Sequence, residues 1–395
     1  MVTVVGCTGH ATTTEVSTMS QRFSKITRRL GILVAVAAAF AVATPAAAAP
    51  NNGTPPGEPN NKKVTVMTRN LYLGTGLTDI VTAPTLPQFV EAVTRARQNV
   101  IETDFAARAD ALATEIQQAG PDLVGLQEAS LWRTQTPADL SGTPNATTPF
   151  QDFLAILQSE LAERGLAYTA VATSTNADVE APYLDPAAPV NPVLGLPLSD
   201  IRLTDRDVIL ARSGVATSNP QNGHYAAQLT VPTAAGSTVS FTRGWTSVDA
   251  TVNGASFRFF NSHLETESPV PAIQVAQGAE ALGIVTASPL PVVVVGDFNS
   301  DAAGTTTPTY ANLIAGGLVD AWPAANRNDP GLTCCQNELL TNPVSENTTR
   351  IDLVLTRGDW QAKKVSTVGA APFRNAPAPL WASDHAGVVA ELKLK

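Results

Sequence analysis

Cysteine is scarce in this chain, with only three among 395 residues. Cys7 precedes the predicted start of the mature protein, which leaves the adjacent residues Cys334 and Cys335. Two neighbouring cysteines do not match the ligand spacing of a zinc site. They can be bonded to each other, free, or bonded to another molecule. We expect a structural role, as a vicinal disulfide within a loop.

Runs of lysine and arginine are also missing, and the formal net charge is −9. Removal of residues 1–49 takes away a net charge of +3 (four Lys and Arg against one Glu), so the mature charge is −9 − 3 = −12. An acidic protein has no overall field that attracts polyanions. This argues against processive binding of nucleic acid, although a local basic patch would suffice. Such a patch could be formed by Arg69, Arg202, Arg206, Arg212 and Arg243.

A long apolar run occurs near the N-terminus, and its pattern is that of an export signal. A basic stretch after Met19 leads into the apolar segment Gly31–Val42, and Thr44–Ala49 carries small residues with an Ala-x-Ala pattern. Pro45 and the weak hydrophobicity of alanine argue against a stable membrane span. We therefore expect an N-terminal extension and secretory signal peptide over residues 1–49, beginning near Met19, and a secreted protein. Sec and twin-arginine export both remain open.

The remaining chain predicts a flexible linker over residues 50–62 and one domain over residues 63–395. The apolar spacing predicts helices over Leu86–Asn99, Asp104–Ala119, Phe150–Arg164 and Gln274–Val285. Strands are expected at Lys63–Asn70, Asp122–Gln127, Tyr168–Thr173, Asp207–Ala211, Tyr225–Val231, Val239–Val252, Ser256–Ser262, Arg350–Thr356 and Ala386–Leu394, with an edge strand near Lys364–Val368. The proline-rich insertion Asn176–Asp200 is expected to be an irregular loop. Because helices alternate with strands that also form hairpins, two packed mixed sheets with helices outside are favoured.

The segment Pro291–Asp301, PVVVVGDFNSD, is the clearest local pattern. Four successive valines predict a strand that is buried on both faces. Asp297 and Asn299 follow at its carboxyl end, two residues apart, and can project to one side. Their side chains suit holding a water molecule and a phosphoryl oxygen. The same residues are also good turn formers, so this segment alone does not decide between the two interpretations.

Carboxylates, amides and histidines recur where predicted core strands begin or end. These positions are Asn70, Glu128, His263, Asp297, Asn299, Asp352, Asp384 and His385. Carboxylate and amide oxygens suit Mg²⁺, and histidines beside them suit proton transfer. A salt bridge for Asp352 and a core position for His385 are the alternatives. His224 is expected to be an ordinary surface histidine.

Six short motifs of this kind occur along the chain, in the order TRNLYLG, GLQEA, NSHLE, GDFNSD, RIDLVL and SDHAGV. In this order the chain resembles the endonuclease/exonuclease/phosphatase superfamily, which includes deoxyribonuclease I and bacterial neutral sphingomyelinases. The resemblance spans Lys63 to Leu394. It implies an α/β four-layer sandwich, in which two packed mixed β-sheets are flanked by helices.

The resemblance also implies a metal site. Glu128 matches the glutamate that binds the divalent metal, Asn70 the asparagine beside it, and Asp384 the acidic residue near it. The expected cofactor is Mg²⁺, with Mn²⁺ or Ca²⁺ as alternatives; one ion is expected and a second is possible.

The implied catalytic residues are His263, Asp297, Asn299, Asp352 and His385. By resemblance, Asp297 positions or deprotonates the attacking water and Asn299 orients the phosphate. Asp352 orients the catalytic His385, and His263 contacts the phosphate or acts as an acid.

The expected function is secreted, metal-dependent hydrolysis of a phosphoester, with a phosphodiesterase or nuclease preferred. The substrate is a nucleic acid or a phospholipid headgroup. The alternatives are a sphingomyelinase C-like phospholipid or inositol-phosphate hydrolase, and a binding module that uses the same fold without catalysis. No obligate protein partner is expected, and we expect a monomer.

Overall fold

The computed structural model describes residues 61–141, 143–232 and 238–395. The predicted signal peptide and most of the predicted linker lie outside this range. Within it, no helix combines the length and the apolar character needed to cross a membrane.

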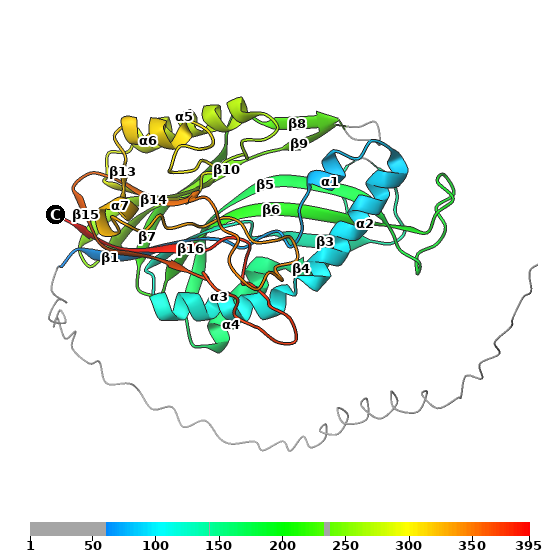
Figure 1. Ribbon diagram of the computed structural model, residues 1–395, viewed down its shortest axis with the longest axis horizontal. Helices are drawn as coiled ribbons and strands as arrows, with labels where there is room; N and C mark the ends of the chain where they lie inside the picture. Colours follow the sequence, from blue (N-terminus) through cyan, green and yellow to red (C-terminus); the bar gives the residue numbers. More distant parts are fainter. Residues whose placement is uncertain (1–60, 142, 233–237) are drawn as a thin grey trace, which may run out of the picture. The chain divides into compact units, whose positions relative to one another are not determined.

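The first of two large sheets has the strand order β15-β16-β1-β2-β6-β3-β4, with β5 paired to β6 (Figure 1). Strand β1 is parallel to β2 and antiparallel to β16, so the sheet is mixed. The strands are β1 (Lys63–Asn70), β2 (Leu123–Gln127), β3 (Leu131–Gln135), β4 (Thr148–Asp152), β5 (Tyr168–Leu184), β6 (Leu198–Arg212), β15 (Trp360–Val368) and β16 (Gly387–Leu394). The predicted edge strand near Lys364–Val368 is confirmed as β15.

The second sheet has the order β13-β14-β12-β11-β10-β7 and is mixed as well. Its strands are β7 (Ala216–His224), β10 (Gly244–Val252), β11 (Ala255–His263), β12 (Val292–Asp297), β13 (Val319–Asp320) and β14 (Asp352–Arg357). Strands β8 (Leu229–Pro232) and β9 (Thr238–Phe241) form a separate hairpin.

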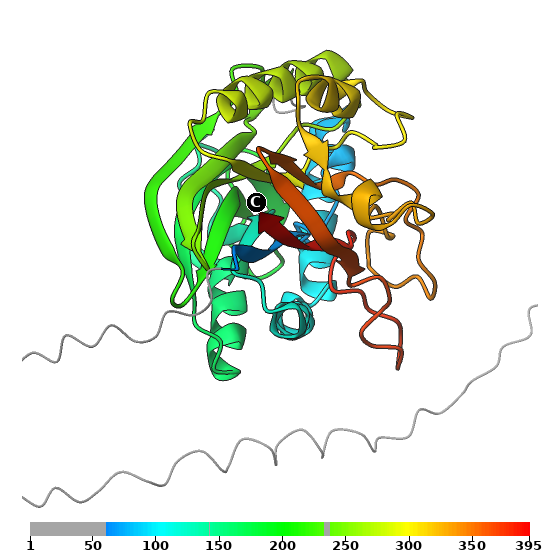
Figure 2. The ribbon, with the colours of Figure 1, turned by 90° about the vertical axis from the view of Figure 1, so that its left-hand side faces the viewer.

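Helices cover the outer faces of both sheets, which confirms the predicted four-layer arrangement (Figure 2). Helices α2 (Leu86–Glu102), α3 (Phe105–Ala119) and α4 (Phe153–Glu163) pack with the first sheet. Helices α5 (Pro271–Thr286) and α6 (Thr309–Ala315) pack on the second. The short helices α1 (Thr78–Val81) and α7 (Ala321–Ala325) complete the set that the structure describes.

The valines of β12 show why the layers form. Val292 and Val294 pack under α5 and α6, while Val293 and Val295 face the first sheet. All four are essentially inaccessible to solvent. Burying such a side chain contributes about 1.5–3 kcal/mol, so this central strand joins two cores.

The two sheets approach closely at Gly125 of β2. A Cβ atom there would lie 2.5 Å from Val295 Cγ2 and 2.7 Å from Asn261 Oδ1. The Gln127 side chain bridges the same gap, because its Nε2 donates to Asn261 Oδ1 over 2.6 Å. The buried amide pair satisfies polar groups that would otherwise be costly between two apolar faces.

The insertion Asn176–Asp200 was expected to be irregular throughout, which is wrong for its two ends. Its first nine and last three residues belong to β5 and β6, which pair as one long hairpin, with Val179 opposite Leu203 and Leu184 opposite Leu198. Residues 185–197 between the two strands form the loop. Prolines on this edge hairpin did not prevent pairing, because an edge strand tolerates a missing N–H donor.

Other strand boundaries also differ from expectation. Phe150 belongs to β4 rather than to the following helix, the predicted strand over Tyr225–Val231 shrinks to β8, and the predicted strand Val239–Val252 is divided into β9 and β10. Strands β3, β4 and β7 were not predicted. The sequence of β7, ATSNPQNGH, is rich in turn formers, and pairing with β10 overrides that local preference.

Candidate active site

Three neighbouring strands of the second sheet present one row of polar side chains. His263 ends β11, Asp297 ends β12 and Asp352 begins β14, and each lies directly opposite the next in the strand register. The row depends on Gly296, whose φ of +147° and lack of a side chain are both required. A Cβ atom there would lie 1.9 Å from Ser262 O.

His385 joins this row from the segment before β16. Its Nδ1 lies 2.8 Å from Asp352 Oδ2, and its Nε2 lies 3.7 Å from Asp297 Oδ2. The buried guanidinium of Arg69 donates to the His385 carbonyl and fixes the backbone at this point. The predicted partnership of Asp352 and His385 is therefore present in the structure.

Two asparagines hold Asp297. The Asn70 Nδ2 donates to Asp297 Oδ2 over 3.1 Å, while its Oδ1 accepts from the Tyr72 amide. The Asn299 backbone N–H donates to Asp297 Oδ1 over 2.9 Å, and its side chain donates to Leu264 O. Both carboxylate oxygens of Asp297 are thereby oriented, since each accepts a hydrogen bond.

Glu128 and Asp384 form an acidic side of the same site. Leu73 N–H donates to Glu128 Oε2 over 2.6 Å, and Asp384 Oδ1 lies 4.0 Å from His385 Nε2. Burial, then the carboxylates of Asp384 and Asp205, raise the pKa of Glu128 to about 8. Carboxyl groups are thus crowded at this point, and burial and their mutual repulsion disfavour full ionisation.

Two of these positions have a left-handed backbone that residues other than glycine rarely adopt. Glu128 has φ of +56° and Asn299 has φ of +48°. Such conformations cost about 1–3 kcal/mol and cluster at functional sites. Seven other described residues besides glycine share this conformation, so it supports a functional role only together with the contacts of Glu128 and Asn299.

The two histidines are driven to opposite protonation states. Burial lowers the pKa of His385, but Asp352, Asp384 and Asp297 outweigh it and raise that pKa well above the usual value. Burial, Arg243 and the charge on His385 lower the pKa of His263. Burial and the neighbouring Asp352 raise the pKa of Asp297 to about 7.

Arg243 and Glu265 belong to the site but were not predicted as a pair. Arg243 Nη1 lies 3.2 Å from both ring nitrogens of His263, and its Nη2 donates to Glu265 Oε1 over 3.0 Å. The motif NSHLE includes Glu265, and that position was the available signal.

A second unpredicted group lies on β6. Asn176 Nδ2 donates to Asp207 over 2.8 Å and to Asp205 over 3.3 Å. Both carboxylates are buried, and burial raises the pKa of each. Nothing in the local sequence, LTDRDVIL, distinguished these residues from ordinary strand positions.

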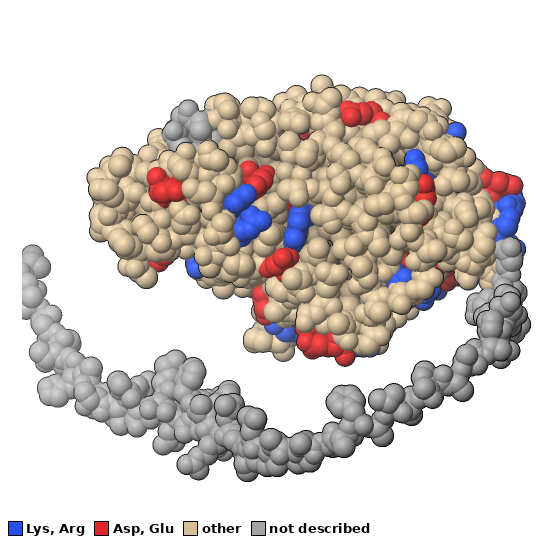
Figure 3. All heavy atoms as spheres, turned by 180° about the vertical axis from the view of Figure 1, so that it is seen from behind, with Lys and Arg blue, Asp and Glu red and all other residues tan. Residues whose placement is uncertain are grey.

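The five arginines suggested as a phosphate patch do not form one. Each is paired with a carboxylate: Arg69 with Glu115, Arg202 with Asp178, Arg206 with Asp152, Arg212 with Asp122 and Arg243 with Glu265. Of the five, Arg243 contacts the side chain of His263, whereas Arg69 contacts the site only at the backbone carbonyl of His385. The face in Figure 3 likewise shows separate groups of both signs rather than a continuous basic track.

The cysteine pair borders the site. Cys334 is bonded to Cys335, as expected, and Cys335 Sγ lies 3.9 Å from His385 Nε2. His224 lies outside the cluster, where it is exposed and its Nε2 lies 2.6 Å from Thr175 O.

Several solved structures share this fold. A protein from Bacteroides thetaiotaomicron described as an endonuclease/exonuclease/phosphatase family protein is 16% identical, with a TM-score of 0.51 over 84% of this chain and 95% of that one. One from Leptotrichia buccalis is 14% identical, with a TM-score of 0.51 over 84% and 100%. A mannosyl-6-phosphatase from B. thetaiotaomicron is 17% identical, with a TM-score of 0.50 over 83% and 99%. At these identities the likeness concerns the fold.

No curated protein matches the sequence significantly. The family model described as endonuclease/exonuclease/phosphatase family matches residues 98–385, which include most of the polar side chains at the strand ends. The matched region covers well over half of the chain, and the chain belongs to the endonuclease/exonuclease/phosphatase family.

Proposed function

We propose that this protein is a secreted, divalent-metal-dependent hydrolase of phosphodiesters. The observation that carries the proposal is the array of His263, Asp297, Asp352 and His385, which lies beside the carboxyl groups of Glu128 and Asp384 at one edge of both sheets. Family membership supports phosphoester hydrolysis in general.

The donor set fits a hard divalent cation. Glu128 and Asp384 supply carboxylate oxygens, and Asn70 lies beside them with an amide oxygen. The pKa of Glu128 is raised to about 8 by burial and by neighbouring carboxylates, and a cation would offset that repulsion. We propose Mg²⁺ held by these three residues, with Mn²⁺ or Ca²⁺ as alternatives. When bound, the ion neutralises charge on the phosphate and stabilises the leaving oxygen.

Asp297 is placed to act on water. Asn70 and the Asn299 amide fix its two oxygens, and its pKa of about 7 suits proton transfer near neutral pH. We assign it the role of positioning and deprotonating the attacking water.

His385 is the acid in this scheme. Asp352 accepts from Nδ1–H and leaves Nε2–H facing the Asp297 side of the pocket. The imidazolium can donate to a phosphoryl oxygen or to the leaving group. Groups whose surroundings drive their pKa values apart are the expected acid and base of a site.

His263 and Asn299 complete the phosphate contacts. His263 stays neutral beside Arg243, with its Nε2 3.6 Å from Asp297 Oδ2. Asn299 donates one amide hydrogen to Leu264 O and retains a second for a phosphoryl oxygen. We assign both to stabilising charge that grows as water attacks.

The proposal is tested with bis(p-nitrophenyl) phosphate as substrate. Purified protein should hydrolyse it with Mg²⁺ and lose activity with EDTA. Glu128→Gln should lower kcat/KM by at least about 100-fold, the scale of a lost transition-state contact. Glu163→Gln, at the end of α4, is the matched control and should retain activity.

Equal turnover with and without EDTA would reject metal dependence. Absence of both Mg²⁺ binding and turnover would instead favour the non-catalytic binding module. Secretion is tested separately: the full chain expressed in an exporting bacterium should appear outside the cytoplasm, cleaved near Ala49. Size-exclusion chromatography of that product tests the proposed monomer.

A further inference from the structure

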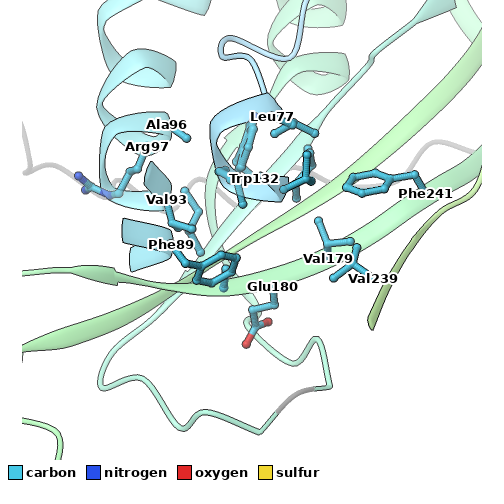
Figure 4. Close-up of a pocket in the computed structure, with 15 residues that line it drawn as sticks. Leu77, Phe89, Val93, Ala96, Arg97, Trp132, Val179, Glu180, Val239 and Phe241 are labelled. Carbon is cyan, nitrogen blue, oxygen red and sulfur yellow. The ribbon is translucent and has the colours of Figure 1, made fainter. Parts of the chain in front are cut away.

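An apolar groove lies between helices α1 and α2 and the outer part of the β5–β6 hairpin (Figure 4). The volume open to the centres of water-sized molecules is about 70 Å³, so the groove is narrow. The floor consists of Val179, Ala181, Ile201 and Leu203, and Phe89, Val93 and Trp132 line one side. Val239 and Phe241 of β9 border the other side.

The floor of the groove continues into the active site along β6. Ile201, Leu203, Asp205 and Asp207 are alternate residues and therefore share one face, with about 7 Å between successive side chains. The Ala129 amide, next to Glu128, donates to the carbonyl of Arg206 over 2.9 Å. Leu203, where the floor of the groove ends, therefore lies two residues along β6 from Asp205, which is close to Glu128.

The two sides of the groove also extend to the active site. Trp132 Nε1 donates to Leu73 O over 3.1 Å, and the amide of that same Leu73 donates to Glu128. On the opposite side, Phe241 precedes Arg243 by two residues, and Arg243 contacts His263. The groove therefore lies next to the position that a substrate bound at the carboxylates would occupy.

The groove offers almost no polar group to a ligand. Among the described residues that line it, only Arg97 and Glu180 are charged, and both are turned away in Figure 4. The Arg97 guanidinium lies over the Phe150 and Tyr183 rings, 5.1 and 4.8 Å from their centres. Glu180 Oε2 accepts backbone hydrogen bonds outside the groove. A nucleobase buried here would lose hydrogen bonds to water without replacement.

Apolar character continues beyond the groove along the same hairpin. Val190 and Val193 in the loop between β5 and β6 are 63% and 78% exposed, and Leu184 and Leu196 beside them are also exposed. Large apolar side chains gathered at one exposed tip suit contact with other apolar material.

We propose that the groove binds the alkyl chain of an amphiphilic phosphodiester while its phosphate occupies the active site. This inference rests on the proposed phosphodiesterase function and specifies its substrate class. The physical basis is the transfer of methylene groups from water to an apolar surface that needs no polar partner.

The test uses p-nitrophenyl alkyl phosphodiesters with chains from methyl to octyl, all below their micelle-forming concentrations. With Mg²⁺, kcat/KM should rise about fourfold per added methylene group until the groove is filled. Failure to cleave the methyl ester or bis(p-nitrophenyl) phosphate would reject the proposed function itself. Cleavage of the short esters with a flat dependence on chain length would overturn only the groove.

Two variants at one floor position sharpen the test. Val179→Trp should fill the groove and abolish the dependence on chain length. Val179→Thr preserves volume and strand preference, so it should fold and reduce the gain per methylene. Val319→Trp, at a 58% exposed position on β13, is the matched control and should behave as the unmodified protein.

Two more substrates identify the kind of molecule that supplies the alkyl chain. If the protein hydrolyses both phosphatidylcholine vesicles and the octyl ester, bilayer lipids are assigned as the substrate. If it hydrolyses the octyl ester but not the vesicles, dispersed amphiphiles are assigned. Faster cleavage of thymidine 5′-(p-nitrophenyl phosphate) than of the octyl ester would overturn the proposal in favour of a nucleotide substrate.

Discussion

Replacing Asp352 with asparagine removes the charge that supports His385 and nearly preserves the shape of the side chain. Asp352 is completely buried, and its Oδ2 lies 2.8 Å from His385 Nδ1. Its Oδ1 accepts no hydrogen bond from the described residues. The substitution therefore acts mainly on the protonation of one imidazole.

The magnitude follows from Coulomb's law. Unit charges separated by 2.8 Å interact by about 6 kcal/mol at an effective dielectric constant of about 20. This corresponds to about four pKa units as an upper limit. Asp297 and Asp384, 3.7 and 4.0 Å from Nε2, still favour the imidazolium and leave part of the shift. Loss of a competent acid should lower kcat by about 10²–10⁴.

The assay compares Asp352→Asn with Asp249→Asn on β10. Asp249 pairs with Arg258 at 2.8 and 3.1 Å in the same sheet, outside the site, so it controls for loss of a sheet carboxylate. Asp352→Asn should lower kcat with little change in KM and shift the alkaline limb of the pH profile downward. Nitrogen-15 NMR of the imidazole reports the His385 pKa directly. An unchanged His385 pKa, or a kcat within threefold of the unmodified protein, would refute the reasoning.

Three more outcomes are expected. Mg²⁺ at 100 times its Kd should stabilise the fold by about 2.7 kcal/mol and raise the Tm of a chain of this length by about 4 °C, measured by calorimetry against EDTA; an unchanged Tm would contradict the metal site. Because burial and a neighbouring carboxylate raise the pKa of Asp297 to about 7, its base form is lost as the pH falls. The kcat/KM should therefore rise with pH up to neutrality and fall again when His385 loses its proton, and a flat profile between pH 5.5 and 7 would exclude Asp297 as the base. Gly296→Ala should prevent folding because its Cβ atom would lie 1.9 Å from Ser262 O, whereas Gly283→Ala on α5, with no atom within 4 Å, should be neutral or stabilising by up to about 1 kcal/mol in urea unfolding.

The strand-end residues could be predicted because each one interrupts an otherwise apolar or alternating pattern. Asp297 after four valines is the clearest case, and the structure places it between the two histidines. The order of the six motifs then carried the resemblance to the family. The strand register could not be predicted in either way, because it depends on pairing between distant segments, and this register puts His263, Asp297 and Asp352 in one row.

Arg243 and Asp205 could not be identified in the same way, because their importance comes from what surrounds them. Arg243 follows a short hairpin strand and reaches His263 only after β10 and β11 have paired. Asp205 resembles any polar residue of an exposed strand until β5 pairs with β6 and the Asn176 side chain donates to its carboxylate. Long-range pairing also explains why the two ends of Asn176–Asp200 were misjudged, since their residues show no strand pattern on their own.

The site is assembled from both sheets, so its geometry depends on the distance between them. Asn70 and Glu128 come from the first sheet, whereas His263 and Asp297 come from the second. The hydrogen bond from Asn70 to Asp297 spans this junction at 3.1 Å, a length that tolerates little change in spacing.

The distance between the two sheets is set in the protein interior, away from the place where a substrate would bind. Gly125 allows β2 to approach Val295, and the bond between Gln127 and Asn261 fixes the relative position of the two strands. Gln127 immediately precedes Glu128, and Asn261 lies two residues before His263 on the same strand face. The contact that joins the cores is therefore also the contact that places Glu128 near the histidines, and the proposed catalytic array at the ends of the strands depends on it.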